Sequence, residues 1–142
     1  MRQIDVQYSI IQHLAKKTGF EVVWVYDGVV LPETKPFITV QQRQNTPTVV
    51  SKQRESVRMV YRFQIGLHTN TAIERATVQE QLNRIFLFDK IALINANEPS
   101  HTLGLFYVNL TAEVPLPAEE VADKTQYHRV YFDIEIDTTL NA

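Results

Sequence analysis

The feature that most constrains the fold is the alternation of side chains along residues 54–67. The polar positions are Arg54, Arg58, Arg62 and Gln64, with Val60 as the exception. The apolar positions are Val57, Met59, Tyr61, Phe63, Ile65 and Leu67. A period of two predicts a β-strand with one buried face and one polar face. Other elements of the chain must therefore cover the apolar face.

The end of the chain repeats this pattern in residues 126–137. Its apolar positions are expected to face inward, and they are Val130, Phe132, Ile134 and Ile136. Strands are also predicted over residues 20–31, 37–44, 90–95 and 105–114, with a turn at Asp27-Gly28. Residues 45–53 and 115–125 are predicted to be loops and the likeliest mobile segments.

Two segments show helical periodicity. Residues 4–17 end in two lysines, and Gly19 can take the left-handed cap. The apolar stripe of this helix is expected at Ile4, Tyr8, Ile11, Leu14 and Ala15. A second helix is predicted to begin at Thr71, because Thr71-Ala72-Ile73-Glu74 matches a capping box, and to run to about Phe88. The apolar stripe of this helix is expected at Ala72 or Ile73, Ala76, Leu82, Ile85 and Phe86.

The order of these elements predicts an α+β fold. Hairpin-like neighbours at both ends favour a mainly antiparallel (mixed) β-sheet with two main α-helices packed on one face. The length of 142 residues fits a single domain spanning 1–142.

Composition excludes several classes of protein. The chain has no cysteine, which rules out disulfide scaffolds, thiolate zinc sites and cysteine nucleophiles. The net charge of −2 gives no basic field for nucleic acid. The N-terminal segment lacks the pattern of a secretory signal, and no apolar run approaches the roughly 20 residues of a membrane span. We expect no membrane partner and a protein made in a cytoplasm.

The acidic residues Asp133, Glu135 and Asp137 suggest a divalent-metal site. However, side chains on the same face of a strand lie roughly 6.5–7 Å apart along it. One ion, at about 2.0–2.6 Å from each ligand oxygen, cannot easily collect three of them. The hydrated face of a strand explains the same residues without a metal, so no metal is predicted.

Other catalytic signatures are also missing. The histidines have no ligand spacing and fall in different predicted elements; they are His13, His68, His101 and His128. The serines lack the G-x-S-x-G setting, and the four glycines form no phosphate-binding motif. We therefore expect no catalytic residues, no cofactor and no enzymatic activity.

Arg54, Arg58 and Arg62 raise the alternative of nucleic-acid binding. The interleaved aromatic residues point to the opposite face, so they cannot stack with bases beside the arginines. The arginines and the carboxylates together would give one sheet face with both signs of charge. We therefore name Arg54, Arg58, Arg62, Asp133, Glu135 and Asp137 as candidates for a subunit interface or for the lining of a lumen.

Over most of its length the chain resembles the tail terminator, or tail completion, proteins of long-tailed bacteriophages, the class that includes the lambda tail terminator. The resemblance rests on the order of elements. These are an opening helix (IDVQYSIIQHLAKK), a strand introduced by proline (KPFITV), a long strand (RMVYRFQIGLH), a helix directly after it (TAIERATVQEQLNRIF) and a closing strand (RVYFDIEID).

The resemblance implies a virion protein that acts at the tail–head junction after assembly in the host cytoplasm. Its subunits would form a homo-hexameric ring that caps the tail tube, stops its polymerisation and presents a surface to the head completion or connector protein. DNA would pass through the lumen without specific binding. Two alternatives remain: a head–tail joining or neck protein of the same fold, and a small metal-dependent or ligand-binding domain.

Overall fold

The computed structural model describes residues 1–51, 53–116 and 128–141, which form two α-helices and eight β-strands. The mixed, mostly antiparallel sheet confirms the predicted α+β class. The helices are α1 (Gln3–Thr18) and α2 (Ala72–Phe88). The strands are β1 (Glu21–Trp24), β2 (Phe37–Gln42), β3 (Thr46–Val49), β4 (Ser56–His68), β5 (Ile91–Ile94), β6 (Thr102–Phe106), β7 (Asn109–Pro115) and β8 (Arg129–Asn141).

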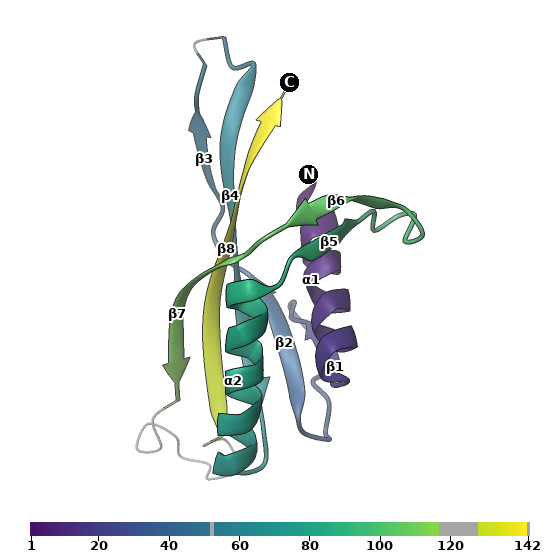
Figure 1. Ribbon diagram of the computed structural model, residues 1–142, viewed down its shortest axis with the longest axis vertical. Coiled ribbons are helices and arrows are strands. Elements are labelled where there is room, and N and C mark those ends of the chain that lie inside the picture. Colours follow the sequence, from purple (N-terminus) through teal and green to yellow (C-terminus); the bar gives the residue numbers. More distant parts are fainter. Residues whose placement is uncertain (52, 117–127, 142) are drawn as a thin grey trace.

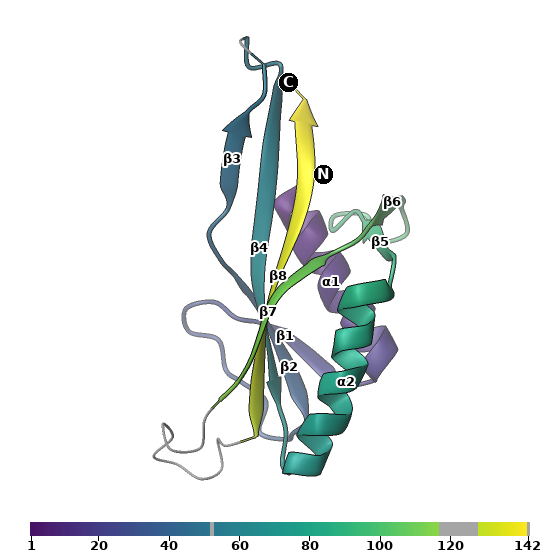
Figure 2. The same ribbon diagram turned by 60° about the vertical axis from the view of Figure 1, so that its left-hand side comes forward.

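The main sheet is built around the long antiparallel pair of β4 and β8. Its strand order is β1-β2-β4-β8-β7, and β3 pairs with the early part of β4, beyond the end of β2. β1 runs parallel to β2, and the other pairs in this sheet are antiparallel. Both helices lie on one face of the sheet, as Figure 2 shows most directly. A separate hairpin of β5 and β6 lies beside α1 (Figure 1).

The core fills the space between the helices and this face, which we call the inner face. Phe86 of α2 packs edge-on against Phe132 of β8, with the ring centroids 5.4 Å apart. All four predicted inward residues of β8 are buried, as are Tyr61, Phe63, Ile65 and Leu67 of β4. The helices contribute Val6, Ile10 and Leu14 from α1 and Val78, Leu82, Ile85 and Phe86 from α2. The predicted stripe of α1 is therefore right at Leu14 but wrong at Ile4, which is 41% exposed.

The ends of both helices follow the sequence signals. Gly19 has φ +75°, and its N–H donates to the Ala15 carbonyl at 2.9 Å. The N–H of Glu74 donates to the Thr71 hydroxyl at 3.1 Å, as the capping box predicts. The Glu74 carboxylate accepts from the N–H of Asn70 at 2.9 Å, one residue before the expected donor.

The predicted start of the apolar stripe on α2 is wrong, because Ala72, Ile73 and Ala76 are exposed. The buried face of α2 contains Val78 and Leu82, and one helical turn before Val78 this face passes through positions 74 and 75. The three predicted positions therefore lie off the buried face. The first turn of α2 therefore adds a cap, while Val78 supplies the buried contact that the prediction omitted.

Residues 45–53 were predicted to be a loop, but they contain strand β3. Pro47 suggested a loop because proline cannot donate to a sheet. The N–H of Val50 donates to the Ser56 carbonyl, so even-numbered residues of β3 direct their main-chain groups toward β4. The nitrogen of Pro47 therefore points away from β4, and its missing N–H costs no hydrogen bond in the sheet. Arg54 lies in the following turn with φ +57°. The prediction that Arg54 shares a strand face with Arg58 and Arg62 is therefore wrong.

Other strand boundaries also differ from prediction. The expected strand over residues 105–114 is divided between β6 and β7, which belong to different sheets. The prediction missed this break because the apolar alternation continues through it. A register shift after Leu110 turns Glu113 toward α2, where it accepts a hydrogen bond from Gln79. The first strand ends at Trp24, and the last extends to Asn141. The predicted loop at 115–125 lies mostly outside the described residues.

Gly66 of β4 stands opposite Thr39 of β2, in a space too small for a side chain. A Cβ atom there would stand 2.3 Å from the Thr39 hydroxyl and 3.2 Å from the His68 ring. We predict that Gly66→Ala lowers the free energy of unfolding by about 1–3 kcal/mol, measured by urea denaturation. Adding Thr39→Ala removes the nearest atom and should recover part of the loss. Equal stability of wild type and Gly66→Ala would contradict this account.

Candidate functional site

The outer face of the main sheet, opposite the helices, carries a set of charged pairs across β4 and β8. Arg62 stands directly across from Glu135, and its Nε lies 3.3 Å from a Glu135 oxygen. Arg58 reaches diagonally to Asp137, with its Nε 3.0 Å from both carboxylate oxygens. The sequence therefore named four residues that the fold does bring together, and the pairing of β4 with β8 explains why.

The Arg58–Asp137 pair is exposed, with 53% of the Arg58 side chain and 41% of the Asp137 side chain accessible, and the Arg62–Glu135 pair is partly buried. Hydrogen bonding from Arg58 is the main cause that lowers the pKa of Asp137 below its usual range. Arg62 also donates to the Thr46 hydroxyl, so it links β4 to β3 as well as to β8. Exposed pairs of this kind guide strand register more than they stabilise the fold.

The remaining two candidates are placed differently. Asp133 lies across from Gln64, and its side chain makes no ion pair with any described residue. Its main-chain oxygen accepts from the Thr111 hydroxyl at 3.1 Å. Arg54 lies in the β3–β4 turn, so it is not part of the charged face.

A metal at this face has no support in the part of the chain that the structure describes. That part contains no group of three or more His, Cys, Asp or Glu residues placed to hold an ion. Glu135 and Asp137 turn to arginines instead of converging on a common point. The sequence shows the arginines of β4, but which carboxylate each of them binds depends on the register between β4 and β8, which the sequence did not predict.

A groove of about 530 Å³ adjoins the charged pairs. It lies along β4, between the end of β2 and the start of β3. The sequence could not predict this groove because it depends on how β2 and β3 pair with β4. Its polar lining includes Gln42, Arg43, Gln44, Arg62, Gln64, Thr111 and Asp133. Such groups can hydrogen-bond with the main chain or the side chains of a partner, but they do not make a nucleophile–base pair.

A second cavity of about 250 Å³ lies on the same sheet face, beneath the loop after β1. The ring of His68, only 4% exposed, stacks on Phe37 with centroids 4.4 Å apart. Burial is the main cause that lowers the pKa of His68 to about 4, and nearby Arg129 and Lys35 add to it. His68 is therefore a neutral packing residue near pH 7.

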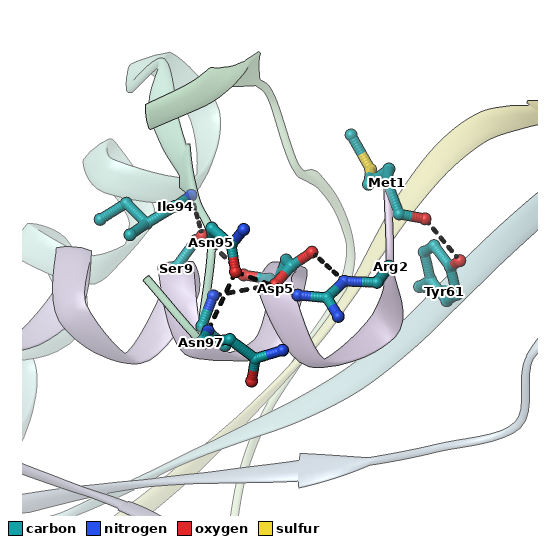
Figure 3. Close-up of polar contacts among 9 residues, drawn as sticks. Met1, Arg2, Asp5, Ser9, Tyr61, Ile94, Asn95 and Asn97 are labelled. Atoms are coloured by element: carbon teal, nitrogen blue, oxygen red, sulfur yellow. Dashed lines mark hydrogen bonds and ion pairs between the residues drawn. The ribbon is translucent and has the colours of Figure 1, made fainter. Parts of the chain in front are cut away.

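A buried carboxylate that the sequence did not reveal lies in α1. Asp5 is 1% exposed and accepts from Arg2 at 2.7 and 2.8 Å and from the N–H of Ala96 at 2.9 Å (Figure 3). The Ser9 hydroxyl accepts from the N–H of Ile94 at 2.8 Å. Hydrogen bonding from Arg2 lowers the pKa of Asp5. These contacts fasten the β5–β6 hairpin to α1, and they leave Asp5 ionised and fully engaged.

The histidines do lie in different elements, as predicted. His13 of α1 contacts Asp89 at 2.8 Å, and His101, just before β6, lies 3.3 Å from Glu98. His68 ends β4, and His128 directly precedes β8.

No protein-family model matches this chain, and no curated protein sequence matches it. Among the described residues, neither helix is long and apolar enough to cross a membrane. The fold and the surface described above are therefore the basis for a functional proposal.

His68 should make stability depend on pH. Its pKa is about 4 in the folded protein and about 6.5 when unfolded, so the unfolded state binds more protons between these values. We predict that the free energy of unfolding falls as pH drops from 6.5 to 4, by up to about 3 kcal/mol. Chemical denaturation across this range should show a weaker dependence for His68→Phe. Parallel curves for the two proteins would contradict the prediction.

The charged face should not respond to divalent metals. We predict that millimolar Mg²⁺, Ca²⁺ or Mn²⁺ leaves the thermal melting temperature unchanged relative to NaCl at equal ionic strength. Arg58→Gln frees Asp137 and provides a sharper test, because the spacing along β8 and the pairing of Glu135 with Arg62 are then what oppose chelation. A metal-specific rise in melting temperature that Asp133→Asn abolishes would establish a metal site instead.

Proposed function

We propose that the protein is a structural subunit of a bacteriophage virion, a tail terminator that forms a hexameric ring. The ring caps the tail tube, ends its polymerisation and provides the interface to the head completion or connector protein. The observation that carries this proposal is the reach of β4 and β8 past both helices. Together with β3 they form an arm that stands clear of the core (Figure 1). Such an extension has little use in a monomer but suits contacts between subunits.

The charged face is compatible with a surface inside such an assembly. It combines Arg58 and Arg62 with three carboxylates, and both arginines are already engaged by carboxylates. Arg58 and Arg62 are therefore less available to phosphates than unpaired guanidinium groups would be. Tyr61 and Phe63 are buried in the core, so they are not available to stack on bases. These features support passage of DNA through a lumen without specific binding.

The proposal places the protein at the tail–head junction of the virion, after assembly in the host cytoplasm, with no catalytic role and no cofactor. A head–tail joining or neck protein of the same fold is the second candidate. The groove of about 530 Å³ beside the charged face would suit a segment of a partner protein in either case. Position on the particle separates the two candidates.

Electron microscopy of the purified protein mixed with tail tubes of its phage tests the proposal. We expect density at one end of each tube, a narrower distribution of tube lengths when the protein is present during polymerisation, and a six-fold ring in end views. Light scattering should give six times the mass of the 16.4 kDa chain for the ring. Binding along the tube wall, or binding to connectors but not to tubes, would contradict the tail terminator assignment.

A further inference from the structure

We propose that the arm joins copies of this chain head to tail, with the distal edge of β8 in one copy pairing in parallel with β3 of the next. This inference rests on the proposed ring and names its interface. The arm comprises β3, residues 56–60 of β4 and residues 137–141 of β8. Figure 1 shows it rising beyond α1 and α2, and Figure 2 shows that neither helix extends along it.

The arm has an apolar row that the described residues cover only in part. Val49, Val57 and Leu140 are cross-strand neighbours on three successive strands. Val49 is 50% exposed, and the other two are only partly buried. Contiguous apolar side chains exposed on a surface are typical of contact sites for another molecule. The row therefore points to completion by another molecule.

The distal edge of β8 can accept a further strand. The pairing of β7 with β8 stops at Glu135, and no described strand lies beside residues 136–141 on that side. The N–H of Leu116 donates to the Arg129 carbonyl, so odd-numbered residues of β8 direct their main-chain groups toward the β7 side. By alternation, Asp137, Thr139 and Asn141 present unpaired N–H and C=O groups along this edge.

The free edge of β3 is the matching surface. Its outward groups come from Pro47 and Val49, because the even-numbered residues face β4. In a parallel pairing, the N–H of Thr139 would donate to the Pro47 carbonyl, and the N–H of Val49 would donate to the Thr139 carbonyl. Both bonds avoid the missing N–H of Pro47. Pairing of β3 with a second β3 would instead meet two prolines on the facing edges.

Direction and register favour this arrangement. β3 and β8 are both antiparallel to β4, so they run parallel to each other. Placing Thr139 opposite Thr48 brings Leu140 beside Val49 of the next copy, which continues the apolar row from subunit to subunit. Because the two paired edges differ, the contact is heterologous and can close into a ring.

Charge distinguishes this contact from a two-fold pairing of β8 with β8. The two-fold pairing would set the same acidic strand of two copies side by side. The β3 side of the subunit carries Arg43 and Arg54, whose side chains form no ion pair in the described part of the chain. Head-to-tail contact brings the acidic side of one copy toward the basic side of the next.

Oxidative cross-linking tests the contact, because the natural chain has no cysteine. Within one copy, positions 49 and 140 lie on either side of β4, about 9.6 Å apart at two strand spacings, which is too far for a disulfide. Val49→Cys with Leu140→Cys should therefore form a ladder of covalent oligomers on a non-reducing gel, while each single variant stays monomeric. A double variant that stays monomeric would overturn the inference, and so would dimers of the Leu140→Cys single variant.

A second pair of variants tests the main-chain bond. Thr139→Pro removes an N–H for which the described residues of the same copy provide no main-chain partner, whereas Thr139→Ala keeps it. We expect similar melting temperatures for both, with self-association of Thr139→Pro weakened about tenfold or more per contact. Equal assembly of the two variants would refute the bond.

The outcomes also separate this inference from the proposed function. Rings that form without the 49–140 cross-link would leave the tail terminator proposal standing and reject this interface. Cross-linked chains that never bind a tube end would support the interface and reject the proposed function.

Discussion

The pairing of β4 with β8 is the interaction on which the rest of the structure depends. Thirteen residues of each strand are aligned, from Ser56 opposite Asn141 to His68 opposite Arg129. A slip of one residue in one strand would turn its apolar side chains to water and its charges into the core. The other elements attach to this pair: β2 and β3 along β4, β7 along β8, and the helices on the inner face.

The same two strands pass through two environments. Near the helices, Phe63 and Phe132 are fully buried, and the main-chain groups of both strands have neighbours on both sides. Along the arm, Val57 and Leu140 continue the apolar pattern without a layer to cover them. The stability of the sheet therefore comes mostly from the half that the helices cover. The continuous pairing of β4 with β8 carries the strand structure into the arm, where a second molecule can add a further strand.

Most of the fold could be predicted from periodicity, because alternation in residues 54–67 and 126–137 fixes which side chains are buried. Features that depend on contacts between distant segments could not be predicted in this way. The split between β6 and β7 was hidden because Phe106, Val108 and Leu110 keep a single phase across it. β3 was missed because proline is tolerated in an edge strand but not in a central one, and the local sequence does not show which of the two a strand will be. Four charged residues of the candidate face were correctly grouped, whereas Arg54 was displaced by a turn that requires a left-handed backbone.

The arginine–carboxylate pairs also bear on how the outer face can be covered. An isolated carboxylate loses hydration when a neighbour covers it, and that loss is costly unless a counter-charge is already in place. Glu135 and Asp137 have their counter-charges within the subunit, on the adjacent strand. Asp133 has no such counter-charge among the described residues, and it borders the groove where β2 ends and β3 begins. Contact with a neighbour is therefore least costly over the paired residues, whereas Asp133 is the position where a partner's cation would add specificity.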